Sequence, residues 1–187
     1  FADLAVAAGV QVVEVREPGG TAIGEKIRAI LLDPANAEMT TRTEMLLYMA
    51  SRAQLFEQRI APALASGAMV LADRFVSSTL AYQGTAGGLD EDGILAVGEV
   101  ATGNHWPDLT VVFDVPTEVA MRRLSPLLDR VEQKGADFHA RVRAGYLAQA
   151  RRWPGRYAVV DSSLPPDQVT AGLLHAVGTW CRGVSAP

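Results

Sequence analysis

Short apolar runs alternate with longer amphipathic stretches along the whole chain, and this alternation constrains the fold more than any other feature. The apolar runs have the length of buried strands and occupy residues 10–15, 69–72, 109–115 and 157–160. The stretches between them are predicted to be helices and occupy residues 23–32, 41–65, 90–101, 119–124, 135–152 and 166–180. The helix over residues 41–65 is predicted to be interrupted or to end near Pro62. Strands that alternate with helices indicate an α/β fold with a mainly parallel sheet flanked by helices.

Length and composition favour one domain that covers residues 1–187. Hydrophobic residues make up 49% of the chain, which is enough for a large core. The net charge of −4 and the lack of a basic stripe argue against a nucleic-acid partner. No apolar run is long enough to span a membrane, and the single cysteine, Cys181, excludes an internal disulfide. We therefore expect a cytoplasmic protein with no membrane or nucleic-acid partner.

An acid and an arginine, Asp73 and Arg74, follow the apolar run over residues 69–72 directly. Ligands bind at the carboxyl ends of strands in open parallel sheets. Hydroxyl, aromatic and amide side chains come next along the chain: Ser78, Thr79, Tyr82 and Gln83. An isolated Asp-Arg pair is more often an ion pair at the end of a strand. Together with the side chains that follow, this pair indicates a site for a phosphorylated substrate that carries a ring.

A second polar cluster follows the apolar run over residues 10–15 and reads Arg16-Glu17-Pro18-Gly19-Gly20-Thr21. Paired glycines let a backbone approach a ligand closely, and a proline stiffens the approach. Taken alone, this cluster is an ordinary turn between a strand and a helix.

Together, the two clusters resemble the thymidylate kinase family. The family's R-E-P-G-G-T loop matches residues 16–21, and its D-R-Y/F-x-x-S-x-x-A-Y-Q signature matches residues 73–83. Three further matches occur in the family's order, at residues 46–54, 106–110 and 128–132. The resemblance covers about residues 4–169 and implies a three-layer α/β sandwich of the nucleoside monophosphate kinase type, within the P-loop NTPase fold. It also implies a kinase that converts dTMP to dTDP with ATP and Mg²⁺, a step in dTTP biosynthesis.

The resemblance assigns the phosphate chemistry to the strand ends. Asp73 is expected near the metal and the phosphates, and Arg74 is expected to hold the dTMP phosphate, because an arginine fork can bind two phosphate oxygens. Arg16, Glu17 and Pro18 are carried over as lining the monophosphate site. Glu17 could equally be a structural partner for a nearby arginine.

The nucleoside side of the site is also carried over from the family. Tyr48 is expected to stack on the thymine ring, and Arg52, four residues later on the same helical face, to reach an exocyclic oxygen of the base. Without the family match, a half-buried core tyrosine and a surface arginine would be preferred. Ser78, Thr79 and Gln83 are expected to bind base or sugar, and Tyr82 to pack beside the deoxyribose and disfavour a ribose 2′-hydroxyl.

A short lid over the ATP phosphates is expected around residues 122–135. Arg130 is the expected catalytic arginine of this lid, and it is expected with Glu132 and Arg141 near the ATP phosphates. Gly87 stands where the family often has an arginine, so any role of that arginine is in doubt.

The phosphate-binding pattern G-x-x-x-x-G-K-S/T does not occur in these 187 residues. We expect the natural chain to carry that loop ahead of residue 1. A truncated, non-catalytic nucleotide-binding module is one alternative, and a kinase for another deoxynucleoside monophosphate is a second. The family pairs through packed helices, so a homodimer is expected, with the helices over residues 41–65 and 90–101 as contributors.

Overall fold

The computed structural model describes residues 1–123 and 129–184, and its strands are all paired in parallel. Strand β1 (Val12–Arg16) pairs with β2 (Met69–Asp73), and β3 (Thr110–Asp114) pairs with β4 (Tyr157–Asp161). The predicted α/β class and parallel pairing are confirmed. Among the described strands, the hydrogen-bonded pairs are grouped as two two-stranded parallel sheets.

Helices fill the connections between the strands. The α-helices are α1 (Ala2–Ala7), α2 (Ala22–Leu32), α3 (Thr41–Leu55), α4 (Ala61–Ala65), α5 (Val76–Thr79), α6 (Glu91–Thr102), α7 (Thr117–Arg123), α8 (Ala136–Arg152) and α9 (Pro166–Val184). Short 3₁₀ turns are η1 (Pro34–Asn36) and η4 (Glu132–Lys134), and π-helical turns are η2 (Phe56–Ile60) and η3 (Leu80–Thr85). Side-chain oxygens of Thr21, Thr40 and Asp90 each accept a hydrogen bond from a backbone amide in the first turn of α2, α3 and α6.

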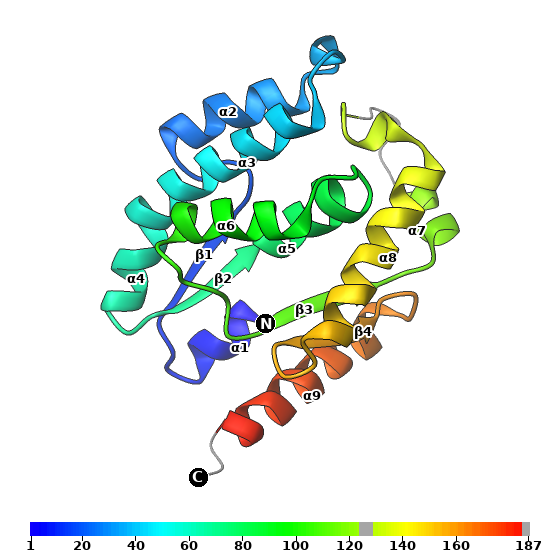
Figure 1. Cartoon of the computed structure of the whole chain (residues 1–187). Coiled ribbons are helices and arrows are strands. Elements are labelled where there is room, and N and C mark those ends of the chain that lie inside the picture. Colours follow the sequence, from blue (N-terminus) through cyan, green and yellow to red (C-terminus); the bar gives the residue numbers. More distant parts are fainter. Residues whose placement is uncertain (124–128, 185–187) are drawn as a thin grey trace.

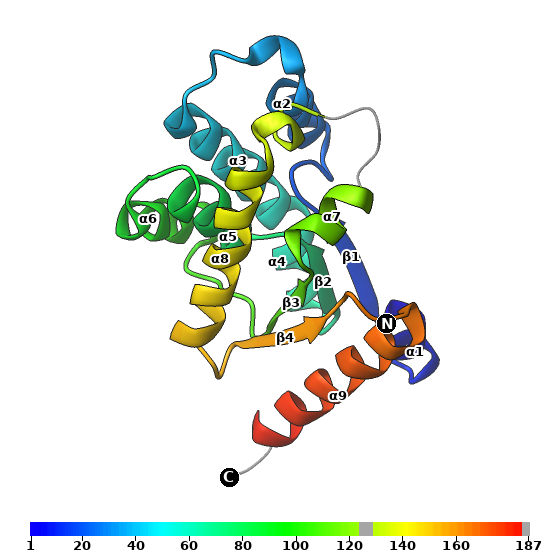
Figure 2. The same cartoon turned by 90° about the vertical axis from the view of Figure 1, so that its right-hand side faces the viewer.

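The helices are layered around the two sheets (Figures 1 and 2). Helices α2, α3 and α6 lie side by side, with α3 in contact with both of the others. The β3–β4 sheet lies between α8 and α9, and α8 also packs along η3. This arrangement brings α3, η3 and α8 together above the carboxyl ends of β1 and β2, where the two polar clusters lie.

The predicted interruption near Pro62 lies earlier in the chain than expected. The structure has a π-helical turn over Phe56–Ile60, and Pro62 sits in the first turn of α4. Proline donates no backbone hydrogen bond, and its ring crowds the carbonyl of the preceding turn. A wider turn directly ahead of Pro62 accommodates the ring, so the helical path continues to Ala65.

The largest core cluster joins the β1–β2 sheet to α3, α5 and α6. Its most deeply buried members include Met49, Leu55, Val76, Leu80 and Ile94. Within residues 1–123 and 129–184, no helix is long and apolar enough to cross a membrane. The predicted lid and the predicted helix over residues 119–124 extend into residues 124–128, which lie outside the described part of the chain.

Candidate functional site

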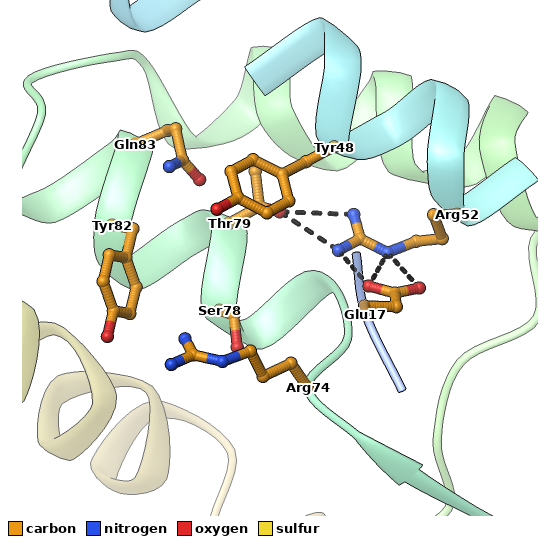
Figure 3. A pocket seen from close by; sticks show the side chains of 8 residues that line it. All are labelled: Glu17, Tyr48, Arg52, Arg74, Ser78, Thr79, Tyr82 and Gln83. Atoms are coloured by element: carbon orange, nitrogen blue, oxygen red, sulfur yellow. Dashed lines mark hydrogen bonds and ion pairs between the residues drawn. The ribbon is translucent and has the colours of Figure 1, made fainter. Parts of the chain in front are cut away.

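A pocket lies where the loop after β1, helix α3 and the segment after β2 meet (Figure 3). Its lining consists of side chains that the sequence had singled out: Glu17, Tyr48, Arg52, Arg74, Ser78, Thr79, Tyr82 and Gln83. Side chains that are far apart in the sequence and belong to separate elements therefore surround one small volume. A cation, hydroxyls, an amide and aromatic rings surround this volume, which suits a ligand with both a charged and a ring-shaped part.

Glu17 and Arg52 form the most deeply buried charged pair in the pocket. The Nε and Nη2 atoms of Arg52 donate to the two carboxylate oxygens of Glu17 at 2.6–3.1 Å. Their side chains are 2% and 1% exposed, respectively. The reading of Glu17 as a structural partner for an arginine therefore fits its geometry, while the same residue also lines the pocket. Burial raises the pKa of Glu17, and the ion pair with Arg52 opposes that rise.

The terminal nitrogens of Arg52 also contact Thr79 and Met49. Both Nη1 and Nη2 lie 3.2 Å from the hydroxyl oxygen of Thr79, and Nη1 also donates to the sulfur of Met49. Thioether sulfur is a weak acceptor. Nη1 is the terminal nitrogen of Arg52 that does not bind Glu17, and its acceptors are a neutral hydroxyl and a thioether.

Tyr48 lies one helical turn before Arg52, on the same face of α3 (Figure 3). Burial, followed by the charge of Glu44, raises the pKa of Tyr48 to about 12. Its phenol is therefore neutral at physiological pH, and its ring is partly buried at the pocket wall. A neutral aromatic face at this position can stack on a planar base.

Arg74 occupies a left-handed backbone conformation, with φ of 69°, at the carboxyl end of β2. Such conformations are uncommon for residues other than glycine and cluster at functional sites. The guanidinium carbon lies 5.1 Å from the centroid of the Tyr82 ring. Asp73, directly before it, is exposed and pairs in register with Arg16, and its carbonyl accepts from the backbone amide of Glu17 at 2.9 Å.

Side chains of helix α8 contact residues of the pocket wall, and the sequence did not reveal these contacts. The Ser78 hydroxyl and the Tyr146 hydroxyl lie 2.6 Å apart, and Gln149 donates to the carbonyl of Ser77 at 3.1 Å. Tyr146 and Phe138 both make edge-on ring contacts with Tyr82. The signal was present in the periodicity, since positions 138, 142, 146 and 149 share one face of the predicted helix over residues 135–152.

Gln83 leads to a second residue that the sequence did not single out. Its amide nitrogen donates to Oε1 of Glu44 at 2.6 Å. Glu44, in the first turn of α3, is 0% exposed and also lies 2.6 Å from Nη2 of Arg130 and 2.9 Å from Nζ of Lys134. A glutamate ahead of a matched segment carries no distinctive pattern, so only the folded arrangement identifies it.

The loop over residues 16–21 is held by its own neighbours. Arg16 forms an ion pair with Glu25 at 2.9 Å, and the same carboxylate accepts from the amide of Gly20 at 2.7 Å. Arg28 donates to the carbonyl of Pro18 at 3.0 Å. Arg16 and Pro18 therefore border the site without lining the pocket, whereas Glu17 lines it directly.

The residues expected on the lid lie outside the pocket. Arg130 is 7% exposed, and its side chain faces Glu44 and the carbonyl of Leu31. Glu132 accepts from the backbone amide of Asp129 at 2.9 Å and so closes a turn. Arg141 is exposed and lies 3.4 Å from the carbonyl of Ala86.

No group of three or more His, Cys, Asp or Glu side chains that could hold a metal ion occurs in residues 1–123 and 129–184. Asp73 offers a single exposed carboxylate beside Arg74. The arginine position of the family pattern, Gly87, is closely surrounded. A Cβ atom there would lie 2.7 Å from Cγ2 of Thr41 and 2.8 Å from the carbonyl oxygen of Gln83.

Comparisons with known proteins identify the family. A family model described as Thymidylate kinase matches residues 2–172. The chain is 46% identical over 180 residues to a thymidylate kinase from Pseudomonas putida strain W619, covering 94% of this chain and 87% of that protein. It is 48% identical over 173 residues to a thymidylate kinase from Thermomicrobium roseum, covering 91% and 81%. The crystal structure of thymidylate kinase from Ehrlichia chaffeensis is similar with a TM-score of 0.73 and 28% identity, covering 95% of this chain and 86% of that chain.

Proposed function

The chain belongs to the thymidylate kinase family, and we propose that it transfers the γ-phosphoryl group of ATP to dTMP at the pocket around Arg52 and Arg74. A phosphate oxygen of dTMP attacks the γ-phosphorus, the bond to the β-phosphate oxygen breaks, and ADP and dTDP form. The reaction supplies the diphosphate precursor of dTTP. The observation that supports the assignment is the shared pocket that Arg74, Tyr48 and Arg52 line together.

Arg52 and Tyr48 serve the base. The Tyr48 ring stacks on thymine, and Nη1 of Arg52 exchanges its weak contact with Met49 for the exocyclic O4. Glu17 keeps the guanidinium in place, because it binds the opposite edge of the fork. Cytosine carries an amino group instead of O4, so a buried donor at this position rejects it.

Arg74 serves the monophosphate. Its fork is always protonated and can bind two phosphate oxygens at once. Tyr82 packs against the guanidinium, and it is proposed to lie beside the deoxyribose and to disfavour a 2′-hydroxyl there. Ser78 and Thr79 offer hydroxyls to the sugar and the base from the same helical turn.

Mg²⁺ fits this site through Asp73. The ion usually binds one or two protein carboxylates together with substrate phosphates and water, and Asp73 supplies one exposed carboxylate at the phosphate end. When bound, Mg²⁺ neutralises part of the phosphate charge. Arg130, Glu132 and Arg141 are proposed to serve the ATP side. Arg130 and Glu132 belong to a proposed lid around residues 122–135 within a single domain, and Arg141 lies on α8, the helix that follows. In the described structure the Arg130 side chain is paired with Glu44, so this role requires that the ion pair break.

The protein is proposed to act as a cytoplasmic homodimer. Its two substrates are cytoplasmic nucleotides, and one cysteine in the whole chain fits a reducing compartment. Exposed apolar side chains lie on the helices α2, α3 and α6: Ile23, Ile30, Leu46 and Val100, the last being 85% exposed. Light scattering on wild type and Val100→Asp tests the dimer, which is expected to dissociate in the variant.

A coupled ADP-release assay with ATP and Mg²⁺ tests the activity, with dTMP, dUMP, dCMP and dGMP as acceptors. Turnover is expected with dTMP preferred. Preference for another acceptor would support a kinase for a different deoxynucleotide. Binding of dTMP by calorimetry without turnover would support a non-catalytic nucleotide-binding module.

A further inference from the structure

Glu44 is a fully buried carboxylate that joins the base side of the pocket to Arg130 and Lys134, which lie in the predicted lid segment. Its Oε1 accepts from the amide nitrogen of Gln83 at 2.6 Å and from Lys134 at 3.0 Å. Its Oε2 lies 2.9 Å from Nζ of Lys134 and 2.6 Å from Nη2 of Arg130. We call Glu44, Gln83, Arg130 and Lys134 the Glu44 cluster. Of these residues, only Gln83 lines the pocket.

An ionised carboxylate only accepts hydrogen bonds, whereas a primary amide has one donor end and one acceptor end. Glu44 therefore binds the amide nitrogen of Gln83, and the amide oxygen of Gln83 points away from Glu44. Figure 3 shows the carbonyl oxygen of Gln83 on the side of Tyr48, with the nitrogen turned away. Gln83 is 1% exposed, so the surrounding protein, rather than water, decides which way the amide points.

This orientation matches one pyrimidine edge and opposes another. Thymine presents an acceptor at O4 beside a donor at its ring N3–H. Arg52 is a donor and the carbonyl of Gln83 is an acceptor, so the pair of side chains complements that edge. Cytosine presents an amino donor and a ring acceptor, and both would face a group of the same kind.

We propose that Glu44 is a positioning residue for base selection, because it fixes the Gln83 amide with its carbonyl toward the base. The inference rests on the proposed function, since it assumes a pyrimidine monophosphate in this pocket. Glu44 does not touch the base itself and acts through Gln83.

Arg130 and Lys134 form ion pairs with Glu44 and thereby stabilise its ionised carboxylate. Burial alone would raise the pKa of Glu44, but hydrogen bonds from Lys134 and Gln83 and the neighbouring charges lower it below its usual value. In Glu44→Gln, the two cations retain the carbonyl of the new amide, which turns its NH₂ group toward Gln83. Gln83 then flips and presents its own NH₂ to the base, an arrangement that suits the ring nitrogen of cytosine.

The test is calorimetric binding of dTMP and dCMP to wild type, Glu44→Gln and Glu44→Asp. The Asp variant keeps the charge but has a shorter side chain. Its carboxylate is expected to lose the hydrogen bond from Gln83 and to keep the ion pair with Lys134, whose side chain is flexible. Both variants are expected to lower the preference for dTMP over dCMP by about tenfold or more. Thermal melts report whether each variant is folded, and the Asp variant decides the matter if Glu44→Gln does not fold.

Two controls separate positioning from general damage. Glu91→Gln makes the same chemical change at a surface ion pair with Arg152 and is expected to leave the preference unchanged. In a Gln83→Met background, Glu44→Gln is expected to change the preference by less than about twofold, because the amide it orients is gone. A full preference for dTMP in both folded Glu44 variants would overturn the role of Glu44 alone. A wild-type protein that binds dCMP as well as dTMP would overturn the proposed function as well.

Discussion

Glu17 and Arg52 form a bidentate ion pair that joins the loop after β1 to helix α3, with both side chains almost entirely removed from water. Both residues line the pocket, and the hydroxyl of Thr79 also lies within hydrogen-bond distance of the guanidinium. A buried pair of this kind contributes position more reliably than stability, because removing two charges from water offsets much of their attraction.

The ion pair predicts a strong coupling between Glu17→Gln and Arg52→Met. Each single variant leaves one buried charge without its partner and is expected to lower the free energy of unfolding by about 3–5 kcal/mol. The double variant removes both charges, so it should lose clearly less than the sum of the two. Urea unfolding of the four proteins measures the coupling. Additive losses would show that the two side chains do not depend on each other.

The stacking role of Tyr48 predicts a difference between two substitutions. Tyr48→Phe keeps the ring and is expected to leave the KM for dTMP within about threefold. Tyr48→Leu keeps apolar volume without a π-face and should raise KM about tenfold or more, since stacking on one base is worth about 1–3 kcal/mol. Steady-state kinetics with dTMP as the varied substrate gives both values. Equal effects of Phe and Leu would argue for simple packing.

The Glu44 cluster predicts how stability depends on pH. The pKa of Glu44 is lowered from its ordinary value of 4.5 in the folded protein. As pH falls below 4.5, Glu44 is protonated in the unfolded chain before it is protonated in the folded protein. The stabilisation that the ionised Glu44 provides above pH 4.5 is therefore lost as pH falls toward the lower pKa of the folded state. Urea unfolding at about pH 6 and about pH 3.5 is expected to show a smaller loss in Glu44→Gln than in wild type. An identical pH dependence would contradict the shift.

Gly87 predicts that the family's arginine position cannot simply be refilled in this chain. A Cβ atom there approaches the carbonyl oxygens of Gln83 and Tyr82 at 2.8 and 3.0 Å, so Gly87→Ala must displace backbone. The expected cost is about 1–3 kcal/mol of stability, with weaker dTMP binding because Gln83 shifts. Gly155→Ala is the matched control, since nothing lies within 4 Å of its Cβ position. Equal stability of the two variants would contradict this account.

The positions of the strands and most helices follow from the sequence, because apolar periodicity reports which face is buried. The predicted strand over residues 157–160 appears as β4 (Tyr157–Asp161), and the predicted helix over residues 90–101 as α6 (Glu91–Thr102). The π-helical turn over Leu80–Thr85 was not predicted, because its widened hydrogen bonding leaves no mark in residue spacing. The separation of the strands into two pairs is equally invisible, since pairing depends on which strands meet in space.

The pocket residues were predicted because they lie in segments with a recognisable order, such as Asp73 to Gln83. Their supports were not. Glu44, Tyr146 and Gln149 act across 39 to 72 positions of sequence, and each is a common residue type in its helix. The side chain of Arg130 shows the reverse case, since its pattern predicts a place near the ATP phosphates and the described structure has it in contact with the buried Glu44. Local pattern identifies the residues of a site, whereas their partners are fixed by tertiary packing.

The most direct test of the account is detection of the product itself. The purified protein is incubated with ATP, Mg²⁺ and an equimolar mixture of dTMP and dCMP, and the nucleoside diphosphates are separated and quantified by mass spectrometry. The account predicts dTDP in large excess over dCDP, with ADP formed in equal amount to the two diphosphates together. Diphosphates formed equally from both acceptors, or ADP released without either, would contradict it.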